Sequence, residues 1–235
     1  MIAVIDCRMP KEARDSLTRL GFSVIPLPPF SALSAPVASH PDMLLFPLGN
    51  RIFVHKAYYQ ETRQAIERIA NESEKELFLV DVPVSSDYPY DIALNLFTVG
   101  KILFGRTDHI PNEIAEYANE MSYQLIHTRQ GYAKCATVTL GERGIISADP
   151  SILQSAQKAG IDALKISQGN VLLPGYEYGF LGGASGHWDH GIFFCGDISA
   201  HPDFININRF CHNRGFHVTS LSRTPLLDVG TILFL

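Results

Sequence analysis

The sequence predicts an α/β protein built as a five-bladed, pseudo-symmetric propeller, in which each blade combines a β-hairpin, a helix and a further strand. Three observations predict this fold class. A short apolar strand motif recurs five times at nearly even spacing, most copies are followed by a stretch with helical period, and the two chain ends each supply part of one copy. The 235 residues are expected to form a single domain, 1–235.

The repeated strand opens after a turn and carries an isoleucine that marks each copy. The marker residues are Ile52, Ile102, Ile145, Ile192 and Ile232, which are 50, 43, 47 and 40 residues apart. Another apolar run precedes each marker, so each pair of runs is expected to form a hairpin. Glycines stand at four of the expected turns: Gly49, Gly100, Gly141 and Gly230.

A short amphipathic helix is expected after four of the hairpins, and a strand after each helix. The apolar positions of these helices fall within 65–69, 114–121, 152–156 and 205–210, and the strands within 77–82, 123–128, 163–167 and 216–221. Prolines at 111, 150 and 202 favour helix starts, where a missing N–H costs nothing.

The fifth copy is divided between the two ends of the chain. The N-terminal part offers a strand, a helix at Lys11–Leu20 and a strand at Phe22–Leu27, while Leu226–Leu235 reads as a hairpin. Pairing the two ends would close the ring and remove two sheet edges. The alternative is an open α/β sheet in which the even spacing is a coincidence.

Composition excludes several classes of function. The net charge is −5 and basic residues do not cluster, so neither nucleic acid nor a membrane is an expected partner. The first residues lack the basic segment of a secretion signal and no apolar run reaches the roughly 20 residues of a membrane span, which predicts a cytoplasmic protein. The four cysteines show no CxxC spacing, so they are read as free thiols, and no cofactor is expected.

Several short motifs connect this repeat pattern to a known fold. They are His40-Pro41-Asp42, Gln130-Gly131-Tyr132-Ala133-Lys134-Cys135, Gly169-Asn170-Val171, Tyr178–Gly183 and Leu227–Leu233. Over essentially the whole chain, they resemble an uncharacterised bacterial family of the pentein fold. That fold also includes the guanidino-group-modifying enzymes, namely arginine and agmatine deiminases, dimethylarginine dimethylaminohydrolase and amidinotransferases. The resemblance implies the fold but carries no assigned reaction.

The resemblance also implies where chemistry would occur. Pentein enzymes place a nucleophilic cysteine, a histidine and carboxylates around a central pocket that holds a flat guanidinium group. This chain departs from the pattern, because Thr224–Leu235 lacks the cysteine that the enzymes carry in the last repeat. Their acidic Glu-Gly-Gly-Asp-like motif is also missing, and Gln168-Gly169-Asn170 is the nearest stretch.

Repeat counting selects candidate catalytic residues. Ten residues before the five markers stand Asp42, Ile92, Cys135, Gly182 and Ser222. Equivalent positions of a ring face the same centre, so Cys135 is expected near Asp42 and His40, with Lys134 favouring the thiolate. In the alternative reading, Cys135 is a small buried apolar residue, Asp42 caps a turn and His40 lies in a surface loop.

Six further residues are candidates for ligand binding. They are Lys134, Gln130, Asn170, Gly182, Gly183 and Asp228. The glycines could present N–H groups to an anion or simply form a flexible loop. Asp228 lies between two apolar residues of an expected strand and faces either the pocket or solvent. The segment His187–His190 reads as a hairpin tip, and no metal site is expected there or elsewhere.

Two functions follow from these residues. The first is a thiol-dependent hydrolase or transferase that acts on the C–N bond of a small guanidine- or amidine-type metabolite. In that reading Cys135 is the nucleophile, His40 the general acid or base, and Asp42 orients a cationic group. The alternative is a non-catalytic pentein that binds a small ligand or a protein. The expected ligand is small and polar, and either cationic or neutral.

Overall fold

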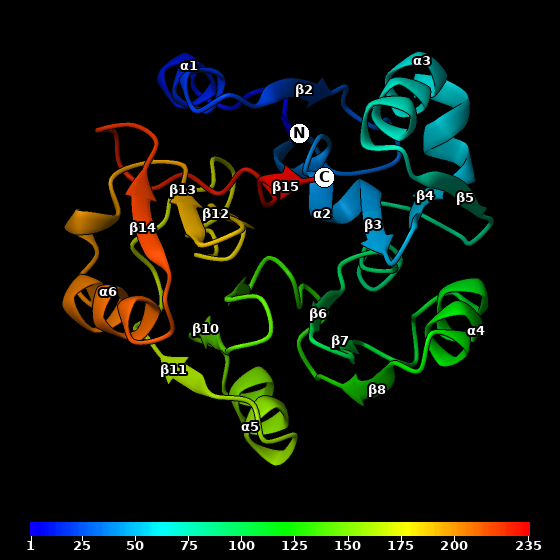
Figure 1. Ribbon diagram of the computed structural model, residues 1–235. Helices are drawn as coiled ribbons and strands as arrows, with labels where there is room; N and C mark the ends of the chain where they lie inside the picture. The colour runs from blue at the N-terminus through cyan, green and yellow to red at the C-terminus, as the bar shows by residue number, and fades with distance from the viewer.

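The computed structural model describes residues 1–235 and forms a ring of five blades around a central axis, as Figure 1 shows from one end of that axis. Each blade is a three-stranded sheet whose middle strand pairs antiparallel with the first strand and parallel with the third. The helix that connects the middle and third strands lies on the outside of the ring (Figure 1). The predicted fold class is therefore confirmed.

The blades follow the chain from residue 45 onward and close with the N-terminus. The first contains β3 (Leu45–Leu48), β4 (Arg51–His55), α3 (Lys56–Ser73) and β5 (Glu76–Val80). The second contains β6 (Phe97–Val99), β7 (Ile102–Gly105), α4 (Asn112–Glu120) and β8 (Gln124–His127). The third contains β9 (Thr137–Thr139), β10 (Ile145–Ser147), α5 (Pro150–Lys158) and β11 (Ala163–Lys165).

The fourth blade contains β12 (Ser185–Trp188), β13 (Gly191–Phe194), α6 (Phe204–His212) and β14 (His217–Ser220). The fifth contains β15 (Leu233–Phe234), β1 (Ile2–Asp6), α1 (Lys11–Arg19) and β2 (Ser23–Leu27). Three single turns lie outside the blades: η1 (Ala35–Val37), α2 (Pro41–Leu44) and η2 (Ile198–Ala200). No helix combines the length and apolarity that crossing a bilayer requires.

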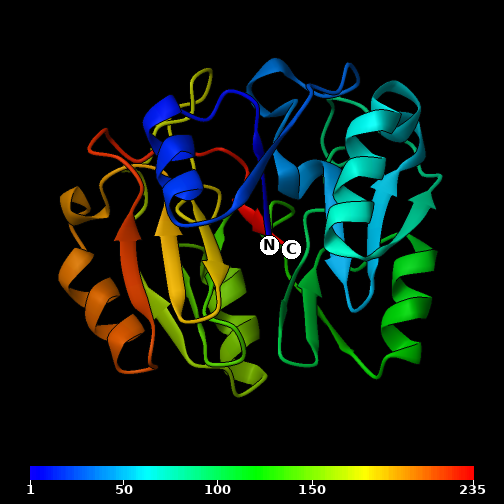
Figure 2. The ribbon, with the colours of Figure 1, turned by 45° about the horizontal axis from the view of Figure 1, so that its top comes forward.

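The two ends of the chain meet in the fifth blade, as predicted. Strand β1 pairs antiparallel with β15, and Ile2 and Leu235 exchange backbone hydrogen bonds of 2.9 and 3.1 Å. Figure 2 shows the two termini side by side.

The expected hairpin at 226–235 is wrong in detail. Leu227 makes a parallel bridge with Leu172, and β15 pairs with β1 instead of with the preceding segment. The cause is a turn at Gly230 and Thr231, whose φ angles of 62° and 73° lie in the left-handed region and lead the chain away from a hairpin.

The helices pack against the sheets with the apolar stripes that the sequence predicts, with two exceptions. Ile66, Ile114 and Ile152 are fully buried, whereas Met121 and Ile205 are 37% and 70% exposed. In α6 the residues that face the sheet are Ile207 and Cys211. The helix begins at Phe204, and Ile205 in its first turn therefore points to solvent.

The turns that precede the first strand of each blade meet at the axis and form a closed chain of hydrogen bonds. We call the residues Asp42, Asn95, Cys135, Gly183 and Thr231, one from each blade, the axial ring. The Thr231 N–H donates to Gly183 (2.7 Å), and the Gly183 N–H donates to the carbonyl of Cys135 (2.7 Å). The Cys135 N–H donates to the side chain of Asn95 (3.2 Å), whose amide donates to the Asp42 carbonyl (3.3 Å). The Asp42 N–H donates to the carbonyl of Gly230 (3.0 Å), the residue before Thr231, and this bond closes the ring.

Candidate functional site

A cavity of about 270 Å³ opens beside the axial ring. Its walls come from the segment before β3, the loop before β9 and the long loop before β12. The residues that line it are Val37, His40, Met43, Tyr132, Cys135, Leu173, Tyr176, Glu177, Tyr178, Phe180 and Asp228. No lysine or arginine is among them, so the carboxylates of Glu177 and Asp228 set the charge of this axial pocket.

Cys135 lies in the turn before β9 and is 4% exposed. Its thiol donates a hydrogen bond to Asp42 Oδ2 (3.1 Å), and the amide of Asn95 donates to its sulfur (3.1 Å). Burial, together with the negative charge of Asp42, raises the pKa of the Cys135 thiol well above its ordinary value.

The expected activation of Cys135 by Lys134 is wrong. The Lys134 ammonium makes no hydrogen bond to the sulfur and donates instead to Thr231 Oγ1 (3.1 Å) and to the carbonyl of Thr137 (3.3 Å). Burial lowers the pKa of Lys134 as well. Lys134 lines a second cavity of about 120 Å³, which the first strands of several blades also line.

Asp42 lies in the first turn of α2 and is 5% exposed. Its Oδ2 accepts hydrogen bonds from the Cys135 thiol and from Thr231 Oγ1 (2.7 Å), whereas Oδ1 has no partner. No side-chain cap is present at the start of α2, so the alternative of a turn-capping aspartate is wrong.

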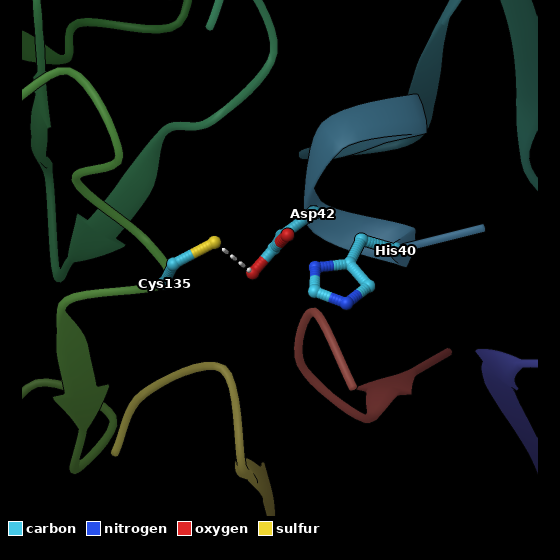
Figure 3. Close-up of side chains that lie close together, drawn as sticks. All are labelled: His40, Asp42 and Cys135. Carbon is cyan, nitrogen blue, oxygen red and sulfur yellow. Dashed lines mark hydrogen bonds between the residues drawn. The ribbon is translucent and has the colours of Figure 1, made fainter. Parts of the chain in front are cut away.

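His40 precedes α2 and is 1% exposed, which rules out the alternative of a surface loop residue. It packs directly on Gly230, where an added Cβ would lie 2.1 Å from the Cβ of His40. Its Nε2 lies 3.7 Å from Asp6 Oδ2 and its Nδ1 lies 4.0 Å from Asp228 Oδ1. Neither ring nitrogen makes a hydrogen bond. Figure 3 shows the side chains of His40, Asp42 and Cys135 close together.

Asp228 faces the axial pocket and not solvent, which answers the question that the sequence left open. It is 4% exposed, and its two oxygens accept hydrogen bonds from the N–H groups of Phe180 (2.8 Å) and Gly230 (3.0 Å). Gly183 lies against it, and an added Cβ there would be 2.0 Å from Asp228 Oδ1. Burial raises the pKa of Asp228, because these neutral donors do not offset the loss of water.

The other predicted ligand-binding residues divide into two groups. Gly182 and Gly183 lie at the axis, but the Gly183 N–H is already bonded to Cys135 and is not available to an anion. Gln130 lies outside the axial pocket, where its amide bonds to Asp149 (3.2 Å). Asn170 is exposed and donates to the carbonyl of Gln168 (3.4 Å). The structure therefore does not bring Gln130 and Asn170 to the axial pocket.

Sequence reasoning missed two members of the axial ring, Asn95 and Thr231. Counting back from the middle strand of each blade misplaced the fifth position at Ser222, because the middle strand of the fifth blade is β1 and not the segment that contains Ile232. Counting back from the first strand would have pointed to Asn95 and Thr231, which stand two residues before β6 and β15.

The aromatic wall of the pocket was also missed. Tyr132, Tyr176, Tyr178 and Phe180 come from two loops that are distant in sequence. Tyr132 and Phe180 lie 6.5 Å apart between ring centroids, and Tyr178 packs edge-on to Phe180 at 6.4 Å.

Comparison with solved structures identifies the same fold in several enzymes. A cysteine-to-serine variant of dimethylarginine dimethylaminohydrolase from Pseudomonas aeruginosa, in complex with citrulline, has a TM-score of 0.60 at 9% identity, covering 93% of this chain and 90% of that one. SxtG, an amidinotransferase from Microseira wollei, has a TM-score of 0.56 at 15% identity, covering 95% and 81%. The N-terminal domain of ArgZ, a cyanobacterial arginine dihydrolase, has a TM-score of 0.55 at 12% identity, covering 93% and 80%.

At these identities the likeness establishes the fold. No curated protein sequence matches the chain. Residues 4–233 match the profile described as "Family of unknown function (DUF6873)". The chain therefore belongs to this uncharacterised family, which has the pentein fold.

Proposed function

We propose that the axial pocket binds a small ligand through a flat, cationic group of the amidine or guanidine type. One observation carries this proposal: the buried carboxylate of Asp228 faces a pocket that contains no lysine or arginine. A buried carboxylate is costly unless a cation or several hydrogen-bond donors balance it. Each Asp228 oxygen has one neutral donor and keeps a free lone pair, so a guanidinium could donate to both.

The pocket walls suit such a group. Tyr132, Tyr176, Tyr178 and Phe180 present aromatic rings, and a flat cation is attracted to the face of an aromatic ring. Glu177 lies at the exposed side of the pocket and adds a second negative charge. Pentein enzymes with bound citrulline or with arginine as substrate are similar in fold, which supports this general class of ligand.

A binding test can compare L-arginine and agmatine with the uncharged analogue citrulline by titration calorimetry. We expect the cationic compounds to bind more tightly than citrulline. The Asp228→Asn substitution should weaken their binding by about 10- to 100-fold, the range of one charged hydrogen-bonded pair. Asp189→Asn, an exposed aspartate at a hairpin tip, is the matched control and should bind as the wild type does.

Equal affinity for citrulline, or an Asp228→Asn variant that binds the cations as well as the wild type, would exclude this function. Because Asp228 accepts two backbone hydrogen bonds, the melting temperature of the variant must be measured in parallel.

A second candidate function is thiol-dependent cleavage of a C–N bond in the bound ligand. The observation that favours it is that the Cys135 sulfur lines the axial pocket together with His40. In such a reaction the sulfur would attack the central carbon of the guanidinium, and the departing amine would take a proton. Water would then cleave the carbon–sulfur bond and restore the thiol. The thiol that donates to Asp42 is protonated, so we place binding before catalysis.

Cysteine labelling and product analysis separate these two functions. In the native protein we expect iodoacetamide to modify Cys7, which is partly exposed, before the buried Cys135. Catalysis requires that arginine or agmatine release ammonia or an amine and that Cys135→Ala abolish this release while keeping ligand binding. Release that persists in Cys135→Ala, or no release at all, leaves only the binding function.

A further inference from the structure

We propose that His40, Asp42 and Cys135 form a zinc-binding site between the axial pocket, which His40 and Cys135 line, and the second cavity, which Asp42 lines. Each residue offers one ligand atom, and an imidazole nitrogen, a carboxylate oxygen and the sulfur lie within 4.8 Å of one another. Cys135 comes from the turn before β9, whereas His40 and Asp42 come from the segment around α2 (Figure 3). Two blades thus bring together a donor set that zinc prefers.

A second, independent observation is that these side chains have unused bonding capacity. Both nitrogens of His40 and Oδ1 of Asp42 are buried and have no hydrogen-bond partner. Buried polar atoms in native proteins are nearly always paired, so unpaired atoms on two neighbouring side chains of this cluster indicate a missing binding partner. His40 is 1% exposed, and its unpaired nitrogens cannot be attributed to bonding with bulk solvent.

The spacing of the ligand atoms suits a tetrahedral ion. Two ligands held at about 2.0–2.3 Å from zinc lie roughly 3.3–3.8 Å apart. The Cys135 sulfur and Asp42 Oδ2 are 3.1 Å apart, and a metal ion would take the place of the thiol hydrogen that now joins them. The imidazole nitrogen lies within 4.8 Å of the other two ligand atoms, so side-chain rotations would have to bring it to this spacing.

The surroundings orient His40 as a ligand. The Nε2 of His40 lies 3.7 Å from Asp6, which leaves Nδ1 for the metal. Asp6 is fixed by hydrogen bonds from Ser39 (2.8 Å) and from Arg8 Nε (3.0 Å). A carboxylate behind the second nitrogen is the usual way in which proteins orient a zinc-binding histidine.

Charge and ligand number indicate the kind of site. A thiolate at Cys135 and the carboxylate of Asp42 carry two negative charges, which one divalent cation neutralises. Sulfur and nitrogen ligands favour zinc over magnesium or calcium, which prefer oxygen. Three protein ligands leave a fourth position for water or a ligand, as in catalytic zinc sites. This inference does not rest on the proposed ligand, since Asp228 and Glu177 remain free to bind a cation.

The test is metal binding by the full-length protein. We expect protein purified without chelators from zinc-supplemented medium to contain about one zinc per chain by elemental analysis. Cobalt added to the metal-free protein should produce the near-ultraviolet charge-transfer band of a cobalt–thiolate bond. Cys135→Ala and His40→Gln should each weaken zinc binding by more than about 100-fold. Cys211→Ala and His187→Gln, which change a buried cysteine and a histidine of the fourth blade, should keep it.

The inference is overturned if neither zinc nor the cobalt band is found, or if zinc binding survives Cys135→Ala. Should the alanine variant fail to fold, the cobalt spectrum of the wild type still reports sulfur ligation, and Asp42→Asn supplies another variant. Titrating agmatine into zinc-free and zinc-loaded protein keeps the two proposals separate, because Asp228→Asn is expected to affect only agmatine.

Discussion

Asp6 and Asp228 flank His40 and are about equally buried, at 1% and 4% exposure, yet they have opposite electrostatic environments. Burial alone would raise the pKa of Asp6, but hydrogen bonds from the Arg8 side chain and backbone hold that pKa below its ordinary value. Burial raises the pKa of Asp228, whose hydrogen-bond donors are two neutral backbone N–H groups. The charge of Asp6 is thus balanced by Arg8, whereas Asp228 is available to a cation. Pairs of carboxylates whose pKa values are shifted in opposite directions are typical of functional sites.

His55 supplies a pH-dependent contribution to stability. Its side chain is 1% exposed, and burial lowers its pKa to about 4, although the backbone of Met43 acts in the opposite direction. At pH values below the ordinary histidine pKa of about 6.5, His55 takes up a proton in the unfolded chain but stays neutral in the folded chain. The free energy of unfolding therefore falls as the pH falls from about 6.5 toward 4, and the loss between pH 7 and pH 5 is about 2 kcal/mol.

Urea unfolding at pH 7 and pH 5 checks this contribution. Phenylalanine has no titrating group and resembles the His55 ring, which stacks on Phe30 at 6.4 Å. His55→Phe should therefore lose about 2 kcal/mol less than the wild type between these pH values. His190→Gln, at an exposed hairpin tip, should keep the wild-type difference. An unchanged difference in His55→Phe would show that other groups cause the acid sensitivity.

At the level of single residues, the sequence predicts where a side chain lies better than it predicts whether that side chain is ionised. Repeat counting placed Cys135 beside Asp42, and the structure brings them into hydrogen-bond contact at 3.1 Å. The neighbouring Lys134 was expected to activate the thiol, but its ammonium donates to Thr231, and the hydroxyl of Thr231 and the thiol both donate to Asp42 Oδ2. The sulfur therefore contacts a carboxylate and not the ammonium. Spacing along the chain contains no information about these contacts.

The blades were predictable as elements because each one repeats the same local pattern. Apolar runs, turn glycines and helical stripes all have a short period, and the structure shows hairpins and helices at nearly all expected places. The last segment differs because its path is decided by tertiary packing. Gly230 fits against His40, and the backbone N–H of Gly230 bonds to Asp228, so the chain turns at the axis before β15. Gly230 marked a turn in the sequence, but no local pattern shows that this turn leads away from a hairpin.

The axial ring depends strongly on Asn95. This residue is fully buried, and its Oδ1 accepts hydrogen bonds from the N–H groups of Lys134 (2.8 Å) and Cys135 (3.2 Å). Asn95→Ala leaves both N–H groups without a partner and should lower the free energy of unfolding by about 2–4 kcal/mol. Asn119→Ala, an exposed position at the end of α4, should stay within about 0.5 kcal/mol.

Asn95→Asp gives a sharper test of the same element. It keeps the acceptor but removes the amide that donates to the Asp42 carbonyl and to the Cys135 sulfur. It also places a negative charge beside the carboxylate of Asp42. We expect the aspartate variant to be at least as unstable as the alanine variant in denaturant unfolding. A near-wild-type midpoint for both variants would mean that the other hydrogen bonds of the ring are sufficient.

At the scale of the whole molecule, the ring was predictable because five nearly equal repeats with divided ends leave few ways to satisfy every sheet edge. The site inside the ring was only partly predictable. The five axial turns come from all parts of the sequence, and the loops that form the pocket wall lie outside the repeated pattern. Their positions depend on how neighbouring blades pack, which is a property of the closed ring.

Closure of the ring by β15 should be essential for stability. Phe234 packs on Phe22 at 4.7 Å and on Phe193 at 5.3 Å between ring centroids, so it connects the fourth and fifth blades. Deleting residues 233–235 removes this aromatic contact, removes the hydrogen bonds between Ile2 and Leu235 and exposes an edge of β1. We expect a loss of several kcal/mol in the free energy of unfolding, from the lost apolar burial and the unpaired backbone.

A circular permutant provides the matched control for this deletion. Because Ile2 and Leu235 are hydrogen-bonded, a short glycine-rich linker can join the ends, and new ends can be opened between the exposed residues Ser86 and Asp87. The permutant retains β15 covalently beside β1, and we expect it to unfold in one cooperative transition with a midpoint near that of the wild type. The truncated chain should unfold at a clearly lower denaturant concentration. If the truncated chain had the denaturant midpoint of the wild type, β15 would not be needed to close the ring. If the permutant failed to fold while the truncated chain folded, the order of the blades along the chain would matter more for stability than closure of the ring.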